Sequence, residues 1–189
     1  MMRLSPRRNS GAYLVEFAII MTFFLTFVIG AMELARAMYL YNTLEDVTRH
    51  AAALAANTDF TDEGAKATLR QSALFRNSPG ALMLGNPITD SHLRIDYLAA
   101  VRGADNKLTL ADIPAATLPG CPTRNRMICL NNPNAPACIR FVRIQVCDPG
   151  DSDQCQRVTY QPIVPLVALA MTIPRMTTIV PAETLGYTP

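Results

Sequence analysis

The fold is decided by one apolar stretch near the N-terminus, residues 11–32, which reads GAYLVEFAIIMTFFLTFVIGAM. Its only charged residue is Glu16. A helix rises about 1.5 Å per residue, so roughly twenty apolar residues cross the hydrocarbon core of a membrane. The stretch therefore predicts a membrane-spanning helix. Three arginines precede it and Glu33 follows it, which predicts a cytoplasmic N-terminus.

The predicted helix does not end at the membrane. Residues 33–56, ELARAMYLYNTLEDVTRHAAALAA, contain no Pro or Gly and are rich in Ala and Leu, which favours a helix. Glu33 and Arg36 are expected to form a weak ion pair on its surface. Apolar residues at spacings of three or four predict one buried face, formed by Leu34, Met38, Tyr41, Leu44, Val47, Ala51 and Leu54.

A cleaved secretory signal peptide is the alternative interpretation of the N-terminal segment. The apolar run is long for such a peptide, and no small-x-small cleavage site is followed by a break in composition. The helical pattern also continues beyond the apolar run. We therefore expect one continuous helix from about residue 12 to 56, with residues 12–32 in the membrane and residues 33–56 outside it.

Glu16 has two interpretations. An acid within a spanning segment is costly and usually marks a function, although this one also lies near enough to the interface to reach lipid headgroups. Its surroundings favour a function. Cleavage after Gly11 would make Ala12 the new N-terminus and Glu16 the fifth residue, followed by Phe17.

This arrangement resembles the processing site of class III signal peptides, which type IV pilins and pseudopilins carry. Within that group, VEFA at 15–18, GAMELAR at 30–36 and the alanine-rich helix at 42–56 resemble the TadE-like proteins of tight-adherence (Tad/Flp) pilus systems. A weaker likeness extends to RVTYQ at 157–161 and TIVPAE at 178–183. Two departures are the absence of the proline that many relatives have near residue 21 and the bulky residues 12–14.

The resemblance implies a structural protein, a minor pilin or pseudopilin that takes part in assembly of a Tad/Flp pilus for adhesion or secretion. A prepilin peptidase would remove the basic leader, residues 1–11, by cutting between Gly11 and Ala12. Glu16 and Phe17 would serve assembly, with Glu16 pairing with the amine of Ala12 on a neighbouring subunit. The implied partners are the bacterial inner membrane, the peptidase, other pilin-like subunits and the assembly machinery.

The five cysteines all fall within residues 121–155. Disulfides explain the cluster better than zinc, because CxxC pairs are absent and the two histidines are distant in sequence. Disulfides imply an oxidising, extracytoplasmic compartment. Cys147 and Cys155 flank a predicted hairpin loop and are expected to be joined. One more pair is expected among Cys121, Cys129 and Cys138, with one thiol left free or paired between chains.

Residues 57–189 are expected to form one small extracytoplasmic domain. The expected fold class is α+β, with the long helix, a second short helix and a small antiparallel sheet with disulfide-stapled loops. Residues 163–173 are apolar but too short to span a bilayer, so they should pack on the sheet or form an exposed contact patch. Residues 110–138 carry many Pro and Asn residues and are expected to be an irregular loop. The expected elements are a helix at 65–76 and strands at 92–101, 142–146, 157–160 and 175–182, with the second and third of these strands forming a hairpin.

Neither composition nor motifs indicate catalysis, a cofactor or nucleic-acid binding. The net charge is only +2, and catalytic and phosphate-binding motifs are absent. His50 and His92 have no nucleophile at local spacing and are expected to be packing or surface residues. Asp148, Asp151 and Asp153 suggest a soluble turn rather than a calcium site, because no later Glu completes the EF-hand spacing.

Two other functions stay open at this point. The chain could be an unprocessed, signal-anchored protein that binds an extracytoplasmic partner. A membrane-anchored enzyme is the least favoured reading, because it would need an active site that forms only in the folded chain.

Overall fold

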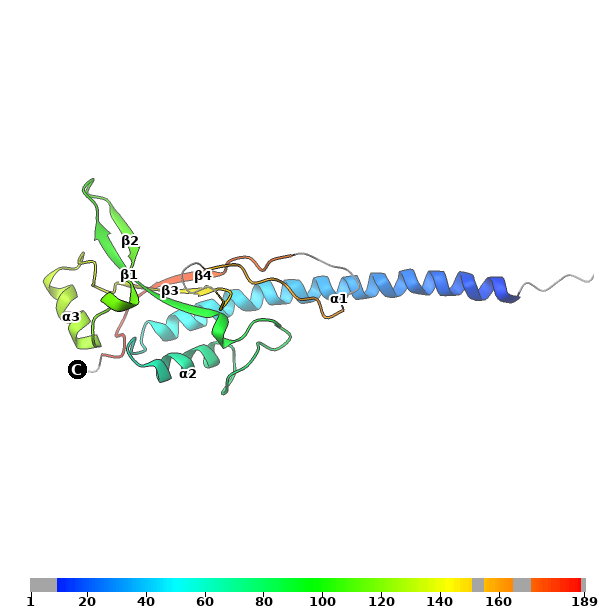
Figure 1. Ribbon diagram of the computed structural model, residues 1–189, viewed down its shortest axis with the longest axis horizontal. Coiled ribbons are helices and arrows are strands. Elements are labelled where there is room, and N and C mark those ends of the chain that lie inside the picture. Colours follow the sequence, from blue (N-terminus) through cyan, green and yellow to red (C-terminus); the bar gives the residue numbers. More distant parts are fainter. Residues whose placement is uncertain (1–9, 151–154, 165–170, 188–189) are drawn as a thin grey trace, which may run out of the picture.

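A single long helix, α1 (Ser10–Ala55), runs through the molecule, and one small domain packs on its C-terminal half (Figure 1). The structure is a computed structural model that describes residues 10–150, 155–164 and 171–187. The expected leader, residues 1–11, lies mostly outside the described residues. The continuous helix and the α+β fold class are confirmed.

Burial divides α1 into two halves. Every side chain from Gly11 to Phe27 is exposed, and Leu40 is the first that is fully buried. The buried face then continues through Leu44 and Val47 to the end of the helix. The predicted apolar face was wrong in its first part, because three of its members, Leu34, Met38 and Tyr41, are exposed.

A four-stranded antiparallel sheet covers one side of this second half, in the order β2-β1-β3-β4. Strand β3 pairs with β1 on one side and with β4 on the other, so both of its edges are occupied. Its side chains alternate, and Val142, Ile144 and Val146 are buried. The strands are β1 (Leu93–Arg102), β2 (Leu108–Asp112), β3 (Phe141–Val146) and β4 (Thr177–Pro181).

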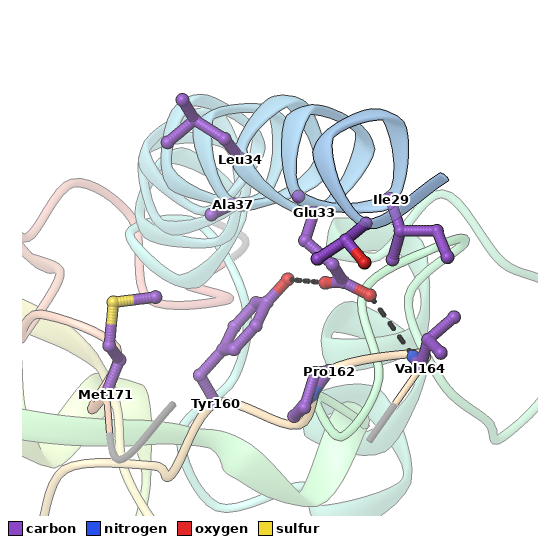
Figure 2. Close-up of a pocket in the computed structure, with 10 residues that line it drawn as sticks. Ile29, Glu33, Leu34, Ala37, Tyr160, Pro162, Val164 and Met171 are labelled. Atoms are coloured by element: carbon purple, nitrogen blue, oxygen red, sulfur yellow. Dashed lines mark hydrogen bonds between the residues drawn. The ribbon is translucent and has the colours of Figure 1, made fainter. Parts of the chain in front are cut away.

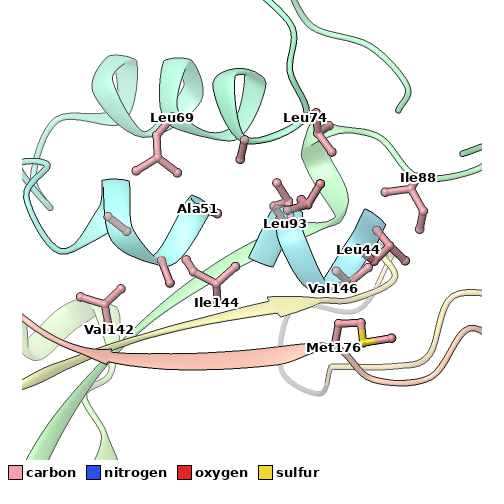
Figure 3. Close-up of a cluster of buried hydrophobic side chains, with 14 of the residues drawn as sticks. Leu44, Ala51, Leu69, Leu74, Ile88, Leu93, Val142, Ile144, Val146 and Met176 are labelled. Carbon is pink, nitrogen blue, oxygen red and sulfur yellow. The ribbon is translucent and has the colours of Figure 1, made fainter. Parts of the chain in front are cut away.

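Helix α2 (Glu63–Ala73) packs on the opposite side of α1 and begins at the N-cap residue Asp62. Figure 3 shows α1 between α2 and the sheet, with Ala51 facing Leu69 and Ile144 in one continuous core. Burying a large aliphatic side chain typically contributes about 1.5–3 kcal/mol. The docked half of α1 is therefore the central core element of the domain.

The segment expected to be irregular, residues 110–138, contains regular structure instead. Strand β2 lies at its start, followed by a short 3₁₀ turn (Ala115–Thr117) and helix α3 (Pro122–Asn131). Pro122 takes the first helical position, where its missing N–H costs nothing. Asn125 on α3 is buried and accepts a hydrogen bond from the Ile139 N–H at 2.9 Å, which docks the helix beside the sheet.

The expected third strand at 157–160 was also wrong. Only an isolated bridge between Thr159 and Thr172 forms there, because β4 already occupies the free edge of β3. The final strand expected at 175–182 is confirmed as β4. Residues 165–170, within the apolar segment 163–173, lie outside the described residues.

Candidate functional site

The first half of α1 presents a long apolar surface that the rest of the described chain leaves uncovered. The most apolar 18-residue window of the helix has no buried residue. Thr22 and Thr26 donate their hydroxyls to carbonyl oxygens four residues earlier, each at 2.8 Å, so these polar groups need no outside partner. By length and composition, α1 can cross a membrane, and it suits a single-pass anchor.

The expected processing and assembly residues, Gly11, Ala12, Glu16 and Phe17, lie in the first turns of α1, and all four are exposed. Among the described residues, no side chain pairs with Glu16. A Cβ added to Gly11 would meet no described atom within 4 Å, so the fold itself accepts a larger residue there. Among the described residues, the fold therefore sets no steric requirement for glycine at this position.

A second group of polar residues lies where the domain first meets α1. The side chains of Glu33 and Arg36 are only 11% and 8% exposed, and their charged atoms approach to 3.7 Å. The hydroxyl of Tyr160 donates to the Glu33 carboxylate at 2.6 Å, and the backbone N–H of Ile163 donates to it at 2.7 Å. We call these three side chains, Glu33, Arg36 and Tyr160, the boundary cluster.

Arg36 completes this cluster by binding two separate loops. Its guanidinium donates to the backbone carbonyl oxygens of Leu84 at 3.0 Å, Asn86 at 2.9 Å and Gln161 at 2.7 Å. It also lies over the Tyr160 ring, 5.2 Å from the ring centroid. One ion pair on α1 therefore holds both the 81–89 loop and the 160–164 segment against the helix.

The contacts also shift the acid–base properties of the cluster. The Tyr160 hydroxyl is the main reason why the pKa of Glu33 lies below its ordinary value, and removal from water only partly opposes it. Burial raises the pKa of Tyr160, and its hydrogen bond to Glu33 adds to the rise. Glu33 is therefore held as a carboxylate and Tyr160 as a neutral donor.

Two hollows lie beside the cluster at the level where α1 leaves the domain. One, of about 310 Å³, lies between α1 and the 160–164 segment, and Figure 2 shows Glu33 reaching across it to Tyr160 and Val164. The other, of about 460 Å³, has walls from Ile29, Met32, Leu84 and Ile163. Apart from the cluster, Thr26 and Tyr39, both hollows are lined by apolar residues and Gly30.

The sequence interpretation missed this cluster. It treated Glu33 and Arg36 as a weak surface pair, whereas both side chains are largely shielded and bind two distant segments of the chain, 81–89 and 160–164. A signal was present, because the only two charges in the segment 30–36 face the same side of the helix as Ala37 and Leu40.

The structure contains two disulfides, Cys129–Cys138 and Cys147–Cys155, with Cys121 free and exposed. The first ties α3 to the segment before β3. The second ties the end of β3 to the segment that carries Tyr160. Among the described residues, no three His, Cys, Asp or Glu side chains come together as a metal site requires.

The other candidate residues serve local structure. His50 stacks on Phe75, with ring centroids 5.8 Å apart. His92 is buried, and its Nδ1 atom accepts from the Thr89 N–H at 3.1 Å. Asp148 accepts from the Gly150 N–H at 3.0 Å within a turn, whereas Asp151 and Asp153 lie outside the described residues.

The sequence of α1 matches a known family. The model of the TadE-like protein family matches residues 11–53, which cover the exposed half of α1 and nearly all of its docked half. No curated protein and no solved structure matches the chain. The TadE-like resemblance read from the sequence is thereby confirmed over residues 11–53, and it points in general terms to a protein associated with Tad pili. The weaker likeness at 157–161 and 178–183 lies outside the matched residues.

Proposed function

We propose that this chain, whose TadE-like helix marks it as a Tad pilus-associated protein, is a minor pilin-like subunit that takes part in assembly of the pilus. The role is structural. One observation carries the proposal: a single unbroken helix has one half buried in its own domain and one half, Gly11 to Phe27, exposed and apolar.

Such a helix suits two environments in succession. Lipid covers the exposed half while the subunit is stored in the membrane, and neighbouring helices cover it in an assembled bundle. Because the helix runs unbroken into the domain core, packing of the exposed half fixes the position of the domain as well. The domain then presents its surface to other pilus components.

Processing gives Glu16 its role in this proposal. A prepilin peptidase removes the leader after Gly11 and leaves a positive amine on Ala12, one helical turn from Glu16. In a helical bundle, the Glu16 carboxylate of one subunit then pairs with the amine of a neighbour. A buried ion pair of this kind sets register between helices more than it adds stability.

N-terminal sequencing of protein from the membrane fraction, in a host that carries the peptidase, tests the proposal. Wild-type chain should begin at Ala12. Gly11→Val should begin at Met1 or Met2, because a bulky residue blocks the cut, while the matched control Gly11→Ala keeps a small residue and should be processed. The fold accepts both changes, since nothing described lies near an added Cβ. A wild-type chain that retains its leader would show an unprocessed anchor instead.

A further inference from the structure

Two loop tips beside the boundary cluster expose large apolar side chains. Met83 is 76% exposed and Ile163 is 64% exposed, and Leu84, next to Met83 on the same loop, is also exposed. Leu84 and Ile163 line the same hollow of about 460 Å³ against α1, so the two loops approach each other there although they are far apart in sequence. Exposed apolar side chains that gather at one place mark a candidate contact surface.

Several backbone groups at and beside these tips form hydrogen bonds within the chain. The Arg36 guanidinium donates hydrogen bonds to the carbonyl oxygens of Leu84, Asn86 and Gln161. The Tyr39 hydroxyl donates to the Met83 carbonyl oxygen at 3.3 Å. The Glu33 carboxylate accepts the N–H of Ile163, and more distantly that of Val164. Backbone groups that enter an apolar phase need such partners, because water cannot supply them there.

Leu84 and Ile163 also lie at the correct depth. From Ala12 to Glu33, α1 rises about 31 Å at 1.5 Å per residue, close to the thickness of a hydrocarbon core, about 30 Å. Glu33 therefore marks the boundary on the side of the domain. Ile163 and Leu84 share walls with Ile29 and Met32, which lie before that boundary on the spanning side. In Figure 1 the domain's loops extend along α1 toward its exposed half.

We propose that the tips formed by Met83, Leu84 and Ile163 insert into the membrane leaflet that faces the domain, with lipid acyl chains filling the hollow between the tips and α1. The occupant is bilayer lipid, because the apolar surface of the tips continues directly into the spanning half of α1. The domain then sits on the membrane at a fixed height and orientation. The inference rests on α1 spanning the membrane and is independent of leader processing.

Single-tryptophan reporters test this proposal, because the chain contains no Trp. Met83→Trp and Ile163→Trp report the tips, and Phe23→Trp reports the middle of the span. Leu108→Trp is the matched control, since Leu108 is 58% exposed and apolar but lies on β2, away from α1. Each full-length variant is reconstituted into phosphatidylcholine vesicles that contain phospholipid spin-labelled at a shallow or a deep acyl position.

The tip reporters should be quenched several-fold more by the shallow label than Leu108→Trp, and should be protected from aqueous acrylamide. The tryptophan fluorescence of Phe23→Trp should be quenched by the deep label. If Phe23→Trp responds and both tip reporters behave like Leu108→Trp, the insertion proposal is wrong while the spanning helix stands. If Phe23→Trp does not respond either, the spanning helix itself is wrong.

A second copy of the chain is the competing occupant. Protection of the tips from both quenchers at high protein-to-lipid ratio, lost on dilution with lipid, would assign the surface to that copy and overturn the proposal. Alkylation without reduction checks the fold of each variant, since only Cys121 should react. The two tip reporters lie on separate loops, so either one decides the outcome if the other misfolds.

Discussion

The hydroxyl of Tyr160 donates a hydrogen bond of 2.6 Å to the carboxylate of Glu33, although 127 positions separate the two residues in the chain. The bond joins the last part of the domain to α1 at the point where the helix becomes exposed. Because Glu33 also binds Arg36 and the Ile163 N–H, this single carboxylate fixes how the domain meets the membrane-side half of the helix.

Removing one partner of this bond should loosen the 160–164 segment. Glu33→Gln and Tyr160→Phe each leave a shielded polar group without its partner, which typically costs about 1–3 kcal/mol. Both variants should unfold at a lower temperature in detergent micelles, and the amides of Ile163 and Val164 should exchange hydrogen faster.

The matched control is Glu45→Gln. Glu45 forms an ion pair with Arg49 on the same helix, but both side chains are well exposed, and such pairs contribute roughly 0–1 kcal/mol. Its thermal unfolding and its exchange at residues 163 and 164 should match wild type. Equal behaviour of Tyr160→Phe and this control would show that the boundary cluster does not hold the segment.

Acid should weaken the same contact. The folded-state pKa of Glu33 is below its ordinary value of 4.5, so its stabilising contribution is complete above pH 4.5 and is lost as the pH falls through the lower folded value. The difference in melting temperature between wild type and Glu33→Gln should therefore shrink below pH 4.5. Burial lowers the pKa of His92. Because His92 is present in both proteins, its effect on the melting temperature cancels in this difference.

Tyr160→Phe tests whether the Tyr160 hydroxyl causes the lowered pKa of Glu33. The Tyr160 hydroxyl is the main cause of the lowered pKa of Glu33, so its loss should move the acid-induced weakening to a higher pH. A pH profile of the Phe variant that coincides with wild type would assign the pKa shift to other groups.

Much of the architecture follows from residue patterns alone. The spanning half of α1 can be predicted because its apolar run has one charge, and β3 can be predicted because its buried residues alternate. In β1, apolar residues alternate with polar ones only at the start of the strand, and Tyr97 to Ala100 are all buried. Strand β2 gives no such signal, since its leucines at 108 and 110 are exposed and it is held by pairing to β1. The apolar residues of helix α3, Met127 to Leu130, are consecutive, so they form no apolar face with a helical period that would reveal the helix.

The sequence did not predict the boundary cluster, because its residues do not form an apolar pattern. A search for an apolar face rejects charged residues, yet Glu33 and Arg36 lie on the docked side of α1, in line with Ala37 and Leu40. Their partners include Tyr160 and loop carbonyl oxygens, which no local spacing connects to the helix. Only the folded chain brings these groups together.

Alkylation without reduction should label one cysteine, Cys121. The structure pairs Cys129 with Cys138 and Cys147 with Cys155, and leaves Cys121 exposed. Mass spectrometry of peptides should find a single adduct on wild type and none on Cys121→Ser. An adduct on Cys147 or Cys155 would contradict the pairing. A reducible dimer that disappears in Cys121→Ser would show that this thiol pairs between chains.

Opening one disulfide should destabilise the domain without affecting the membrane half. The Cys147–Cys155 bridge spans a sequence separation of 8, and closing a short loop typically contributes about 2–3 kcal/mol. A Cys147→Ser/Cys155→Ser chain should melt earlier yet fractionate with the membrane as wild type does. An unchanged melting temperature would remove the stabilising role of this bridge.

Glu16 should matter for assembly and not for membrane insertion. Replacing an acid in a spanning helix by Leu makes insertion easier by roughly 2–3 kcal/mol on translocon scales, so Glu16→Leu should accumulate normally in the membrane. The variant should also be processed at Gly11. It lacks a counter-charge for the amine of Ala12, and an unpaired charge buried among apolar helices is strongly destabilising. We therefore expect no pilus formation and no crosslinking to other pilin-like subunits. Glu16→Asp keeps the charge on a shorter side chain and should recover part of both pilus formation and crosslinking.

Thr22→Val is the matched control for Glu16→Leu. It removes a polar group from the same exposed half of α1, but the Thr22 hydroxyl is already hydrogen-bonded within the helix. It should assemble like wild type. Full piliation by Glu16→Leu, at wild-type protein levels, would remove the reason to treat Glu16 as an assembly residue and would favour a simple membrane anchor.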